Sequence, residues 1–492
     1  MYSKSNLKNK LLLLEVNEIP WRVIDKFKNN PDFPWINKYF TNARTYTTEV
    51  DYEEGHYADK SKLVYGTSKE GKGLMIDSGE LSPWVTWPTF HRGIKSNEHG
   101  IRFLGQDVKT FKGKPIWMDF LEAGLDIGVC GSLQSWPPIY PGKKGFYIPD
   151  TFAHDAKCFP EYIENFQRFN LEQVEKNGLV VRQNSIFSKN LLKFLLHLPR
   201  YGISPHTLFM TFNQLVKERL NKSFLARRVV FQGIISWDIF KSLYKAENPP
   251  AFATFFTNHF ASLMHRYWHE IFPEDLNGSK YQQNKGSHDA VMFGMEIVDK
   301  ILMDAMKFCE KNPDLVIAFA TSMGQEAINY TSYEGYSLEI ENVKKLLEVL
   351  GIEDSDYKIL LAMVPQVAIE VDSADIRNLI KKAFESCFTV NEKPVFACEG
   401  QGKTLSITVL KLESKDIKAG KFIYKSEKNG SMDLAWESSG VKVHKLDAAT
   451  GYHISSGIFA LYGSKIKPSE TREKIKLHEC KSMLLELAFS QN

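Results

Sequence analysis

The segment around Thr86 carries the clearest chemical signal in the chain. It reads Ser82-Pro83-Trp84-Val85-Thr86-Trp87-Pro88-Thr89-Phe90-His91-Arg92-Gly93, followed by Asn97-Glu98-His99-Gly100-Ile101. Proline is favoured in the first turn of a helix, so the position of Thr86 before Pro88 predicts that its hydroxyl lies at a helix N-terminus. Unpaired N–H groups and the helix dipole stabilise anions there, which suits phosphoryl chemistry. The alternative is that Thr86 only caps the helix.

Buried strands must position such a residue. Leu11 to Val16 is a continuous apolar run, which predicts a central strand buried on both faces of a parallel sheet. Polar residues gather at its carboxyl end, where open α/β sheets build their sites. Further strands are expected at 126–130, 251–257, 315–320 and 457–462, with helices at 114–122 and 291–308 among them. This alternation indicates an α/β fold.

Two stretches differ from this core. Between Val180 and Val230 nine Lys and Arg face one acid, Glu218, and apolar residues are interleaved, so we expect a basic helical cap over 176–245. Residues 331–450 mix helical and alternating patterns and are expected to form a small α+β insertion. The α/β core is then 1–175, 246–330 and 451–492. Residues 42–77 are interpreted as a polar excursion or hairpin.

Bulk composition excludes several classes of protein. The chain has 492 residues, is 43% hydrophobic and carries a net charge of only +3, which argues against nucleic-acid binding. Six cysteines without C-x-x-C spacing favour a reducing compartment. Glu15 ends the first apolar run too early for a signal peptide, and no stretch has the length of a membrane span. We expect a cytoplasmic protein, and leave three alternatives for 180–230: a solvated cap face, contact with an anionic substrate, or peripheral membrane contact.

The Thr86 segment resembles the nucleophile segment of nucleotide pyrophosphatase/phosphodiesterase-type enzymes of the alkaline phosphatase superfamily. Three other pieces resemble that superfamily in the right order: Leu11 to Glu15, Pro115-Ile116-Trp117 through Gly128-Val129, and Gly451-Tyr452-His453 with Gly457-Ile458-Phe459. The resemblance covers about residues 10–160, 250–330 and 450–465. It implies a mostly parallel central sheet sandwiched by helices, with Thr86 as the attacking nucleophile.

The resemblance also implies a metal centre, which the sequence matches only in part. Members of the superfamily hold two metals, usually zinc, that activate the hydroxyl and neutralise the phosphoryl group. Glu15 stands where an Asp is expected, and His265 and His453 match two histidine ligands. An expected Asp-His pair is replaced by Ser322-Met323, which are poor ligands. The implied ligand set is Glu15, Thr86, His265 and His453, holding one divalent metal, zinc by preference, or none.

Six residues within or beside the matching motifs are candidates for binding substrate: Asn17, Arg92, Asn258, His259, Arg266 and Ser322. Guanidinium groups match phosphate oxygens, although surface solubility is the alternative for each arginine. Two functions remain open. The first is a phosphoester or phosphodiester hydrolase or phosphoryl transferase acting on a nucleotide, a nucleotide sugar or a lipid-linked phosphate. The second is a repurposed member that binds an anionic ligand or transfers a glycosyl-type group. The oligomeric state stays open.

Overall fold

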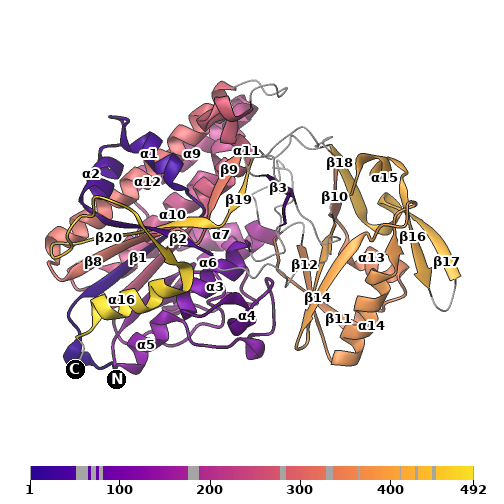
Figure 1. Cartoon of the computed structure of the whole chain (residues 1–492), viewed down its shortest axis with the longest axis horizontal. Coiled ribbons are helices and arrows are strands. Elements are labelled where there is room, and N and C mark those ends of the chain that lie inside the picture. The colour runs from indigo at the N-terminus through magenta and orange to yellow at the C-terminus, as the bar shows by residue number, and fades with distance from the viewer. Residues whose placement is uncertain are drawn as a thin grey trace.

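The computed structural model describes residues 2–50, 81–175, 188–245, 247–276, 284–327, 336–363, 366–410, 412–426, 430–445 and 450–490, and two short strands at 65–67 and 74–76. Figure 1 shows a larger lobe built on a central sheet and a smaller lobe beside it. The chain ends lie side by side on the larger lobe, where the backbone N–H of Lys8 donates to Ala488 at 2.7 Å. The limits of the predicted core, cap and insertion stay predictions.

The central sheet has eight strands in the order β21-β2-β20-β8-β1-β7-β5-β6. The neighbours from β8 to β6 are parallel, and β20 runs antiparallel to both β8 and β2. The strands are β1 (Lys10–Val16), β2 (Arg44–Glu49), β5 (Ile127–Cys130), β6 (Phe146–Ile148), β7 (Phe252–Thr257), β8 (Leu315–Ala320), β20 (Ser456–Tyr462) and β21 (Glu473–Lys476). The mostly parallel α/β fold predicted from the sequence is therefore present, with β1 inside the sheet as expected.

Alternate side chains of β1 enter two different cores. Leu12 and Leu14 join a cluster with α1 (Trp21–Lys28), α2 (Pro34–Asn42), α10 (Arg228–Tyr244), α11 (His259–Ile271) and α12 (Lys285–Lys311). Leu11 and Leu13 join a second cluster with α3 (Pro83–Arg92), α5 (Ile116–Glu122) and α16 (Cys480–Ala488). Both faces of the sheet are covered by helices, as the apolar run of β1 requires.

The excursion predicted for 42–77 needs a correction at its beginning. Arg44–Glu49 forms β2, whose threonines suit a strand and which pairs with β20 and β21. Most of the remaining stretch lies outside the described residues. The predicted basic segment likewise falls partly outside them. Its described part contains α7 (Lys189–Leu196), α8 (Leu198–Tyr201), α9 (Pro205–Leu220) and α10, whereas α6 (Glu164–Glu175) ends just before it.

The smaller lobe has its own apolar core. It contains the sheets β10-β18, β11-β12-β15-β14 and β13-β16-β17. Four of these strands are short: β10 (Tyr336–Ile340), β11 (Tyr357–Leu360), β13 (Cys387–Phe388) and β18 (Val441–Lys445). Its main elements are α13 (Val343–Val349), β12 (Gln366–Val371), α14 (Ala374–Glu385), β14 (Phe396–Gln401), β15 (Thr404–Val409), β16 (Lys421–Ser426) and β17 (Gly430–Ala435). Polar contacts with the larger lobe include the Arg102–Glu399 ion pair at 3.3 Å and a hydrogen bond from Asp107 N–H to Thr404 Oγ1 at 2.9 Å.

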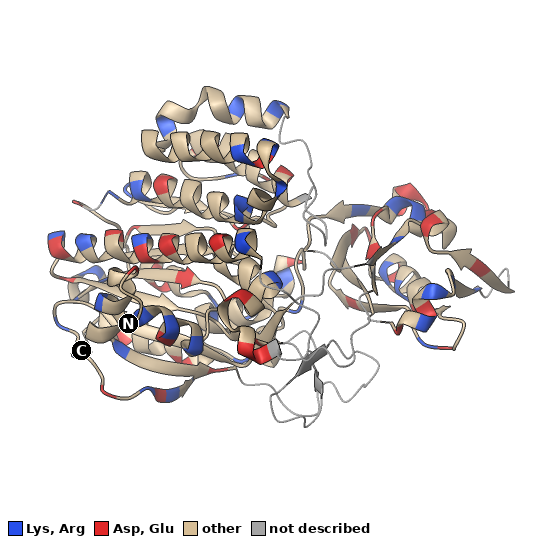
Figure 2. Cartoon of the chain, turned by 90° about the horizontal axis from the view of Figure 1, so that it is seen from above, with Lys and Arg blue, Asp and Glu red and all other residues tan. Residues whose placement is uncertain are grey.

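Charges and thiols agree with the composition. Basic and acidic residues are distributed over both lobes in Figure 2, in keeping with the small net charge. None of the six cysteines, all of which the structure describes, forms a disulfide. Within the described part of the chain, no helix combines the length and apolar composition that crossing a bilayer requires.

The buried Tyr39 hydroxyl joins two strands of the sheet, and its removal should weaken the fold. Tyr39 Oη accepts from the N–H of Phe319 at 3.1 Å and lies 3.0 Å from the carbonyl oxygen of Ala460, which it can donate to. We expect Tyr39→Phe to lower the free energy of unfolding by about 1–3 kcal/mol, because a buried N–H loses its acceptor. Denaturant unfolding measures the loss. Tyr462→Phe is the matched control, since Tyr462 stacks on the same ring but is partly exposed. Equal stability of the two variants would contradict the role of the hydroxyl.

Candidate functional site

The carboxyl ends of three neighbouring parallel strands bring the candidate residues together. Asn17 follows β1, Asn258 follows β7 and Ser322 follows β8, and β1 lies between the other two strands. Asn17 Nδ2 donates to Asn258 Oδ1 at 2.7 Å, and Asn17 Oδ1 accepts from Trp87 Nε1 of α3 at 2.8 Å. The site therefore lies at the edge of the sheet where open α/β folds bind ligands.

Glu18 is the carboxylate at this edge. Its backbone adopts the left-handed conformation with φ 63°, which is costly for a residue other than glycine and is characteristic of functional sites. The side chain is buried, and Oε1 accepts from Asn17 Nδ2 at 2.6 Å. The other oxygen, Oε2, lies 3.0 Å from His265 Nε2 and 3.3 Å from His453 Nε2. Gln325 Nε2 also donates to Oε2.

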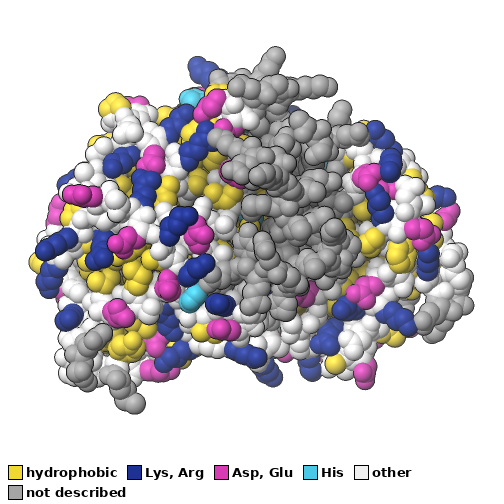
Figure 3. All heavy atoms as spheres, in the orientation of Figure 1, with side chains coloured by type: hydrophobic (Ala, Val, Ile, Leu, Met, Phe, Trp, Pro, Cys, Tyr) yellow, Lys and Arg dark blue, Asp and Glu magenta, His cyan; other side chains and the backbone are white. Residues whose placement is uncertain are grey.

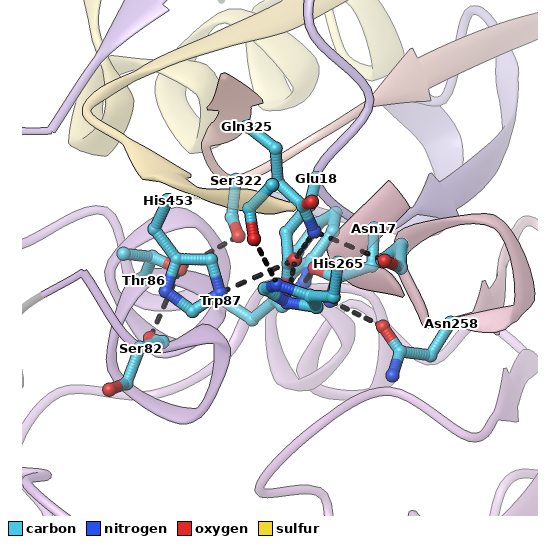
Figure 4. A network of polar contacts seen from close by, with 12 residues as sticks. Asn17, Glu18, Ser82, Thr86, Trp87, Asn258, His265, Ser322, Gln325 and His453 are labelled. Atoms are coloured by element: carbon cyan, nitrogen blue, oxygen red, sulfur yellow. Dashed lines mark hydrogen bonds and ion pairs between the residues drawn. The ribbon is translucent and has the colours of Figure 1, made fainter. Parts of the chain in front are cut away.

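These groups form a donor set that could hold a metal ion. One ligand atom each from Glu18, His265 and His453 lies within 4.8 Å of the others. Figure 4 shows the side chains of Glu18, His265 and Gln325 converging. His453 comes from β19 (Gly451–Ile454), which pairs with β9 (Gly324–Ala327) so that His453 lies opposite Gln325. A short antiparallel ladder thus supplies one of the imidazoles.

The hydrogen bonds of His265 indicate which of its nitrogens is the ligand. Its Nδ1 lies 3.0 Å from the carbonyl oxygen of Gly451, which can only accept, so Nδ1 carries the hydrogen. A neutral imidazole then directs its Nε2 lone pair at the carboxylate of Glu18. Two acceptors face each other unless a proton or a cation lies between them. A histidine that donates its second N–H to a backbone carbonyl is the usual arrangement of a metal ligand.

The charge of Glu18 is stabilised in place. Burial raises the pKa of this carboxyl, but the imidazoles of His453 and His265 more than offset this effect and hold the pKa well below its usual range. Glu18 is therefore an anion at neutral pH, as a metal ligand must be.

Thr86 lies one turn into its helix, and this corrects the predicted helix start. α3 begins at Pro83, and Thr86 N–H donates to Ser82 O at 3.0 Å. The backbone amide of Thr86 is thus used within the helix and is not available to an anion. Its hydroxyl is buried and hydrogen-bonded to Ser322 Oγ at 2.7 Å, a pair that is visible in Figure 4.

The remaining predicted residues have other surroundings. Glu15 points to the α3 side of the sheet, where its Oε1 is 2.8 Å from His91 Nε2 and accepts from Ser132 Oγ at 3.1 Å. It does not belong to the Glu18 cluster. Arg92 Nη1 donates to the carbonyl oxygens of Lys112 and Gly113.

Arg266 and His259 are likewise held by groups of the protein. Arg266 Nη1 donates to Ser262 Oγ at 3.3 Å. His259 Nε2 donates to Gly294 O at 3.0 Å, so its Nδ1 accepts from Thr257 Oγ1 at 2.7 Å. Both ring nitrogens of His259 are hydrogen-bonded to other groups of the protein. The structure therefore does not support the predicted role of His259 in binding substrate.

Sequence reasoning did not assign Glu18 and Gln325 to the site. The sequence shows Glu18 as one of several polar residues at the end of the first strand, beside Glu15, which is the carboxylate that the family resemblance pointed to. Gln325 lies two residues after Met323, and its role depends on the pairing with β19. A carboxylate just beyond the strand end is the signal that could have singled out Glu18.

No protein-family model matches the chain, and no curated protein matches it in sequence. The backbone of the chain is similar to that of several solved structures. Murine ectonucleotide pyrophosphatase/phosphodiesterase 5, in an inactive variant in complex with AMP, is 11% identical with a TM-score of 0.37, covering 98% of this chain and 97% of that one. The human enzyme is 10% identical with a TM-score of 0.39, covering 98% and 96%. A likeness of this size says nothing about the activity of the present chain.

The buried His259 should make the protein sensitive to acid. Burial lowers its pKa from about 6.5 to about 4, so folding favours the neutral ring. This contribution is fully present above about pH 6.5 and is lost as the pH falls towards 4, by about 3 kcal/mol in total. His99, whose pKa burial lowers to about 3, acts in the same direction.

Denaturant unfolding measured across this pH range tests the expectation. His259→Gln should flatten the fall in unfolding free energy, whereas His206→Gln on the exposed surface should leave it unchanged. An identical pH dependence in wild type and His259→Gln would show that His259 is not the responsible group.

Proposed function

We propose that the chain is a phosphoester or phosphodiester hydrolase or phosphoryl-group transferase in which Thr86 is the nucleophile. One observation carries the proposal: a pair of hydroxyls and a possible cation site share one edge of the sheet. Ser322, the partner of Thr86, follows β8, and Glu18 of the Glu18–His265–His453 cluster follows β1, the neighbouring strand. A hydroxyl beside a cation site is what phosphoryl transfer through a covalent intermediate requires. The resemblance of the Thr86 segment to a nucleophile segment supports the same reading.

The residues of the cluster fit a divalent metal, with zinc preferred. A carboxylate and two imidazoles are a common protein ligand set for catalytic zinc, and Nδ1 of His265 is already committed to a carbonyl. Glu18, His265 and His453 would hold the ion. A bound cation would neutralise the phosphate and favour ionisation of a nearby hydroxyl.

The side chains of the chain itself have separate tasks in this reaction. Ser322 Oγ orients the hydroxyl of Thr86, whose oxygen forms the bond to phosphorus while the bond to the leaving group breaks. The hydroxyl proton passes to solvent, and solvent protonates the departing oxygen. Water then releases the phosphoryl group in hydrolysis, or an acceptor hydroxyl releases it in transfer. Asn17 and Asn258 hold each other and Trp87 in place below the site, so α3 is fixed relative to β1. The substrate class we propose is a nucleotide, a nucleotide sugar or a lipid-linked phosphate.

A second function is favoured by the burial of the nucleophile. Thr86 and Ser322 are fully buried and bonded to each other, and Met323 packs in the apolar cluster next to α3. These features fit a protein that binds an anionic phosphate-bearing ligand, or that transfers a glycosyl-type group, without nucleophilic attack by Thr86. The two variants described next separate these functions.

Replacing Thr86 tests the nucleophile. We expect Thr86→Ala to lower turnover of a generic phosphodiester such as bis(4-nitrophenyl) phosphate by roughly a thousandfold or more, because no covalent intermediate can form. Thr86→Ser, which keeps the hydroxyl, should retain measurable activity. An alanine variant that folds and works at the wild-type rate would reject the proposal. If neither wild type nor variant hydrolyses phosphoesters while both still bind a phosphate-bearing ligand, the second function is favoured.

Replacing Glu18 tests the metal site. Glu18→Gln removes the charge from the cluster and should weaken zinc binding by about a hundredfold or more, since the ion loses its only anionic ligand in the set. Competition with a chromophoric chelator measures the affinity. Glu15→Gln is the matched control, because Glu15 is also buried after the same apolar run but contacts His91 instead. Equal zinc affinity of the two variants, or no zinc binding by wild type, would contradict this site.

A further inference from the structure

Helix α9 exposes its apolar side and buries its polar side. Its fully buried residues are Thr207, Gln214 and Glu218, which recur on one stripe of the helix. Of its large apolar residues only Met210 packs against the core, and six are exposed by 38% to 82%: Leu208, Phe209, Phe212, Leu215, Val216 and Leu220. A surface helix of a water-exposed domain has the opposite arrangement. This surface therefore faces something other than water.

The buried polar stripe holds the helix in this orientation. Gln214 Nε2 donates to Glu218 Oε1 at 2.9 Å and to Phe224 O at 2.7 Å. Glu218 accepts from Arg228 Nε of α10 at 3.1 Å and is 3% exposed. Rotation of α9 to hide its phenylalanines would break this ion pair and leave Arg228 without the carboxylate. The outward direction of the apolar side chains is thus built into the fold.

Helix α7, earlier in the same segment, also exposes large apolar side chains. Leu192, Leu195 and Leu196 are 60%, 45% and 71% exposed, while Phe194 on the opposite side of the helix is buried. The exposed apolar residues of α7 and α9 together exceed the scattered single residues that a monomer normally shows.

The charge of this surface has one sign. Six exposed basic residues lie in the stretch from 189 to 222: Lys189, Lys193, Arg200, Lys217, Arg219 and Lys222. The only acid from Ser188 to Arg227 is Glu218, which is buried and neutralised. Over the part of the face that Figure 3 shows in colour, basic and acidic side chains are interspersed. A partner that matches α7–α9 must be apolar and anionic at once.

We propose that the α7–α9 surface docks onto an anionic phospholipid bilayer. Its leucines and phenylalanines enter the boundary between headgroups and acyl chains, and its lysines and arginines contact the lipid phosphates. A second copy of this chain is a poorer partner, because a symmetric contact would set the six basic residues of one copy against those of the other. The contact lies in the plane of the membrane surface, with the sheet core remaining in water.

Vesicle flotation with the full chain tests the proposal. Wild type should float with vesicles of phosphatidylcholine and phosphatidylserine, much less with phosphatidylcholine alone, and less again at high salt, because the Debye length falls below about 10 Å. Phe209→Ser combined with Phe212→Ser should lower the partition coefficient by about tenfold or more. Both residues are 67% exposed, so the unfolding temperature should not change.

Two further variants complete the test. Lys217→Glu combined with Arg219→Glu should abolish the preference for the anionic vesicles. Leu379→Ser is the matched control, since Leu379 is 60% exposed on the smaller lobe and should leave flotation unchanged. The proposal is overturned by a wild type that floats with neither vesicle, or by a phenylalanine double variant that floats like wild type. It is equally overturned if wild type is a dimer in solution and that double variant a monomer.

Discussion

Strand β1 is buried on both faces and hydrogen-bonded along both edges, and the position of the site depends on this constraint. Its registers with β7 and β8 bring Glu15 opposite Phe256 on one side and Ala320 on the other. All three strands therefore end at the same level, and the residues that follow them emerge together. Glu18 then turns into the left-handed region, which aims its carboxylate along the edge instead of into either core. The site is a consequence of three parallel strands that end in step.

Burying the Glu18 carboxylate imposes the second condition. An isolated ion in a buried position is very costly, so the surrounding residues must supply compensating groups. Asn17, Gln325 and two imidazoles do so from four separate segments of the chain. The same convergence ties β9 and β19 to the end of β1. The cluster that could hold a cation therefore also stabilises the fold, and its contacts maintain the strained backbone of Glu18.

Much of the fold could be predicted from the sequence, because short apolar runs such as 11–16 and 315–320, bounded by polar residues, favour buried parallel strands. The choice between Glu15 and Glu18 shows where such reasoning stops. Within a strand, side chains point to one face or the other, so Glu15 enters the α3 side together with Leu11 and Leu13. Only a residue past the strand end can point along the edge. The predicted start of helix α3 was wrong for a similar local reason. Both Pro83 and Pro88 suit the first turn of a helix, and the helix begins at the earlier of the two, after Ser82.

The pairing of β9 with β19 joins residues more than a hundred positions apart, and no local pattern announces it. It nevertheless decides which groups meet Glu18. His453 could be singled out by its motif, whereas Gln325 gains its role only when this ladder forms opposite it.

Charge balance then narrows the proposed chemistry. Met323 is buried in the apolar cluster and Ser322 is neutral, so in the described part of the chain the end of β8 offers no anionic ligands for a second cation. A divalent ion at Glu18 would leave one net positive charge, with both imidazoles neutral. The guanidinium of Arg92 adds nothing here, since it is bound to backbone carbonyls. A phosphodiester carries one negative charge, whereas a phosphomonoester carries about 1.5 to 2 near neutral pH. On the proposed function, a single-cation site of this composition matches the diester and leaves the monoester under-neutralised.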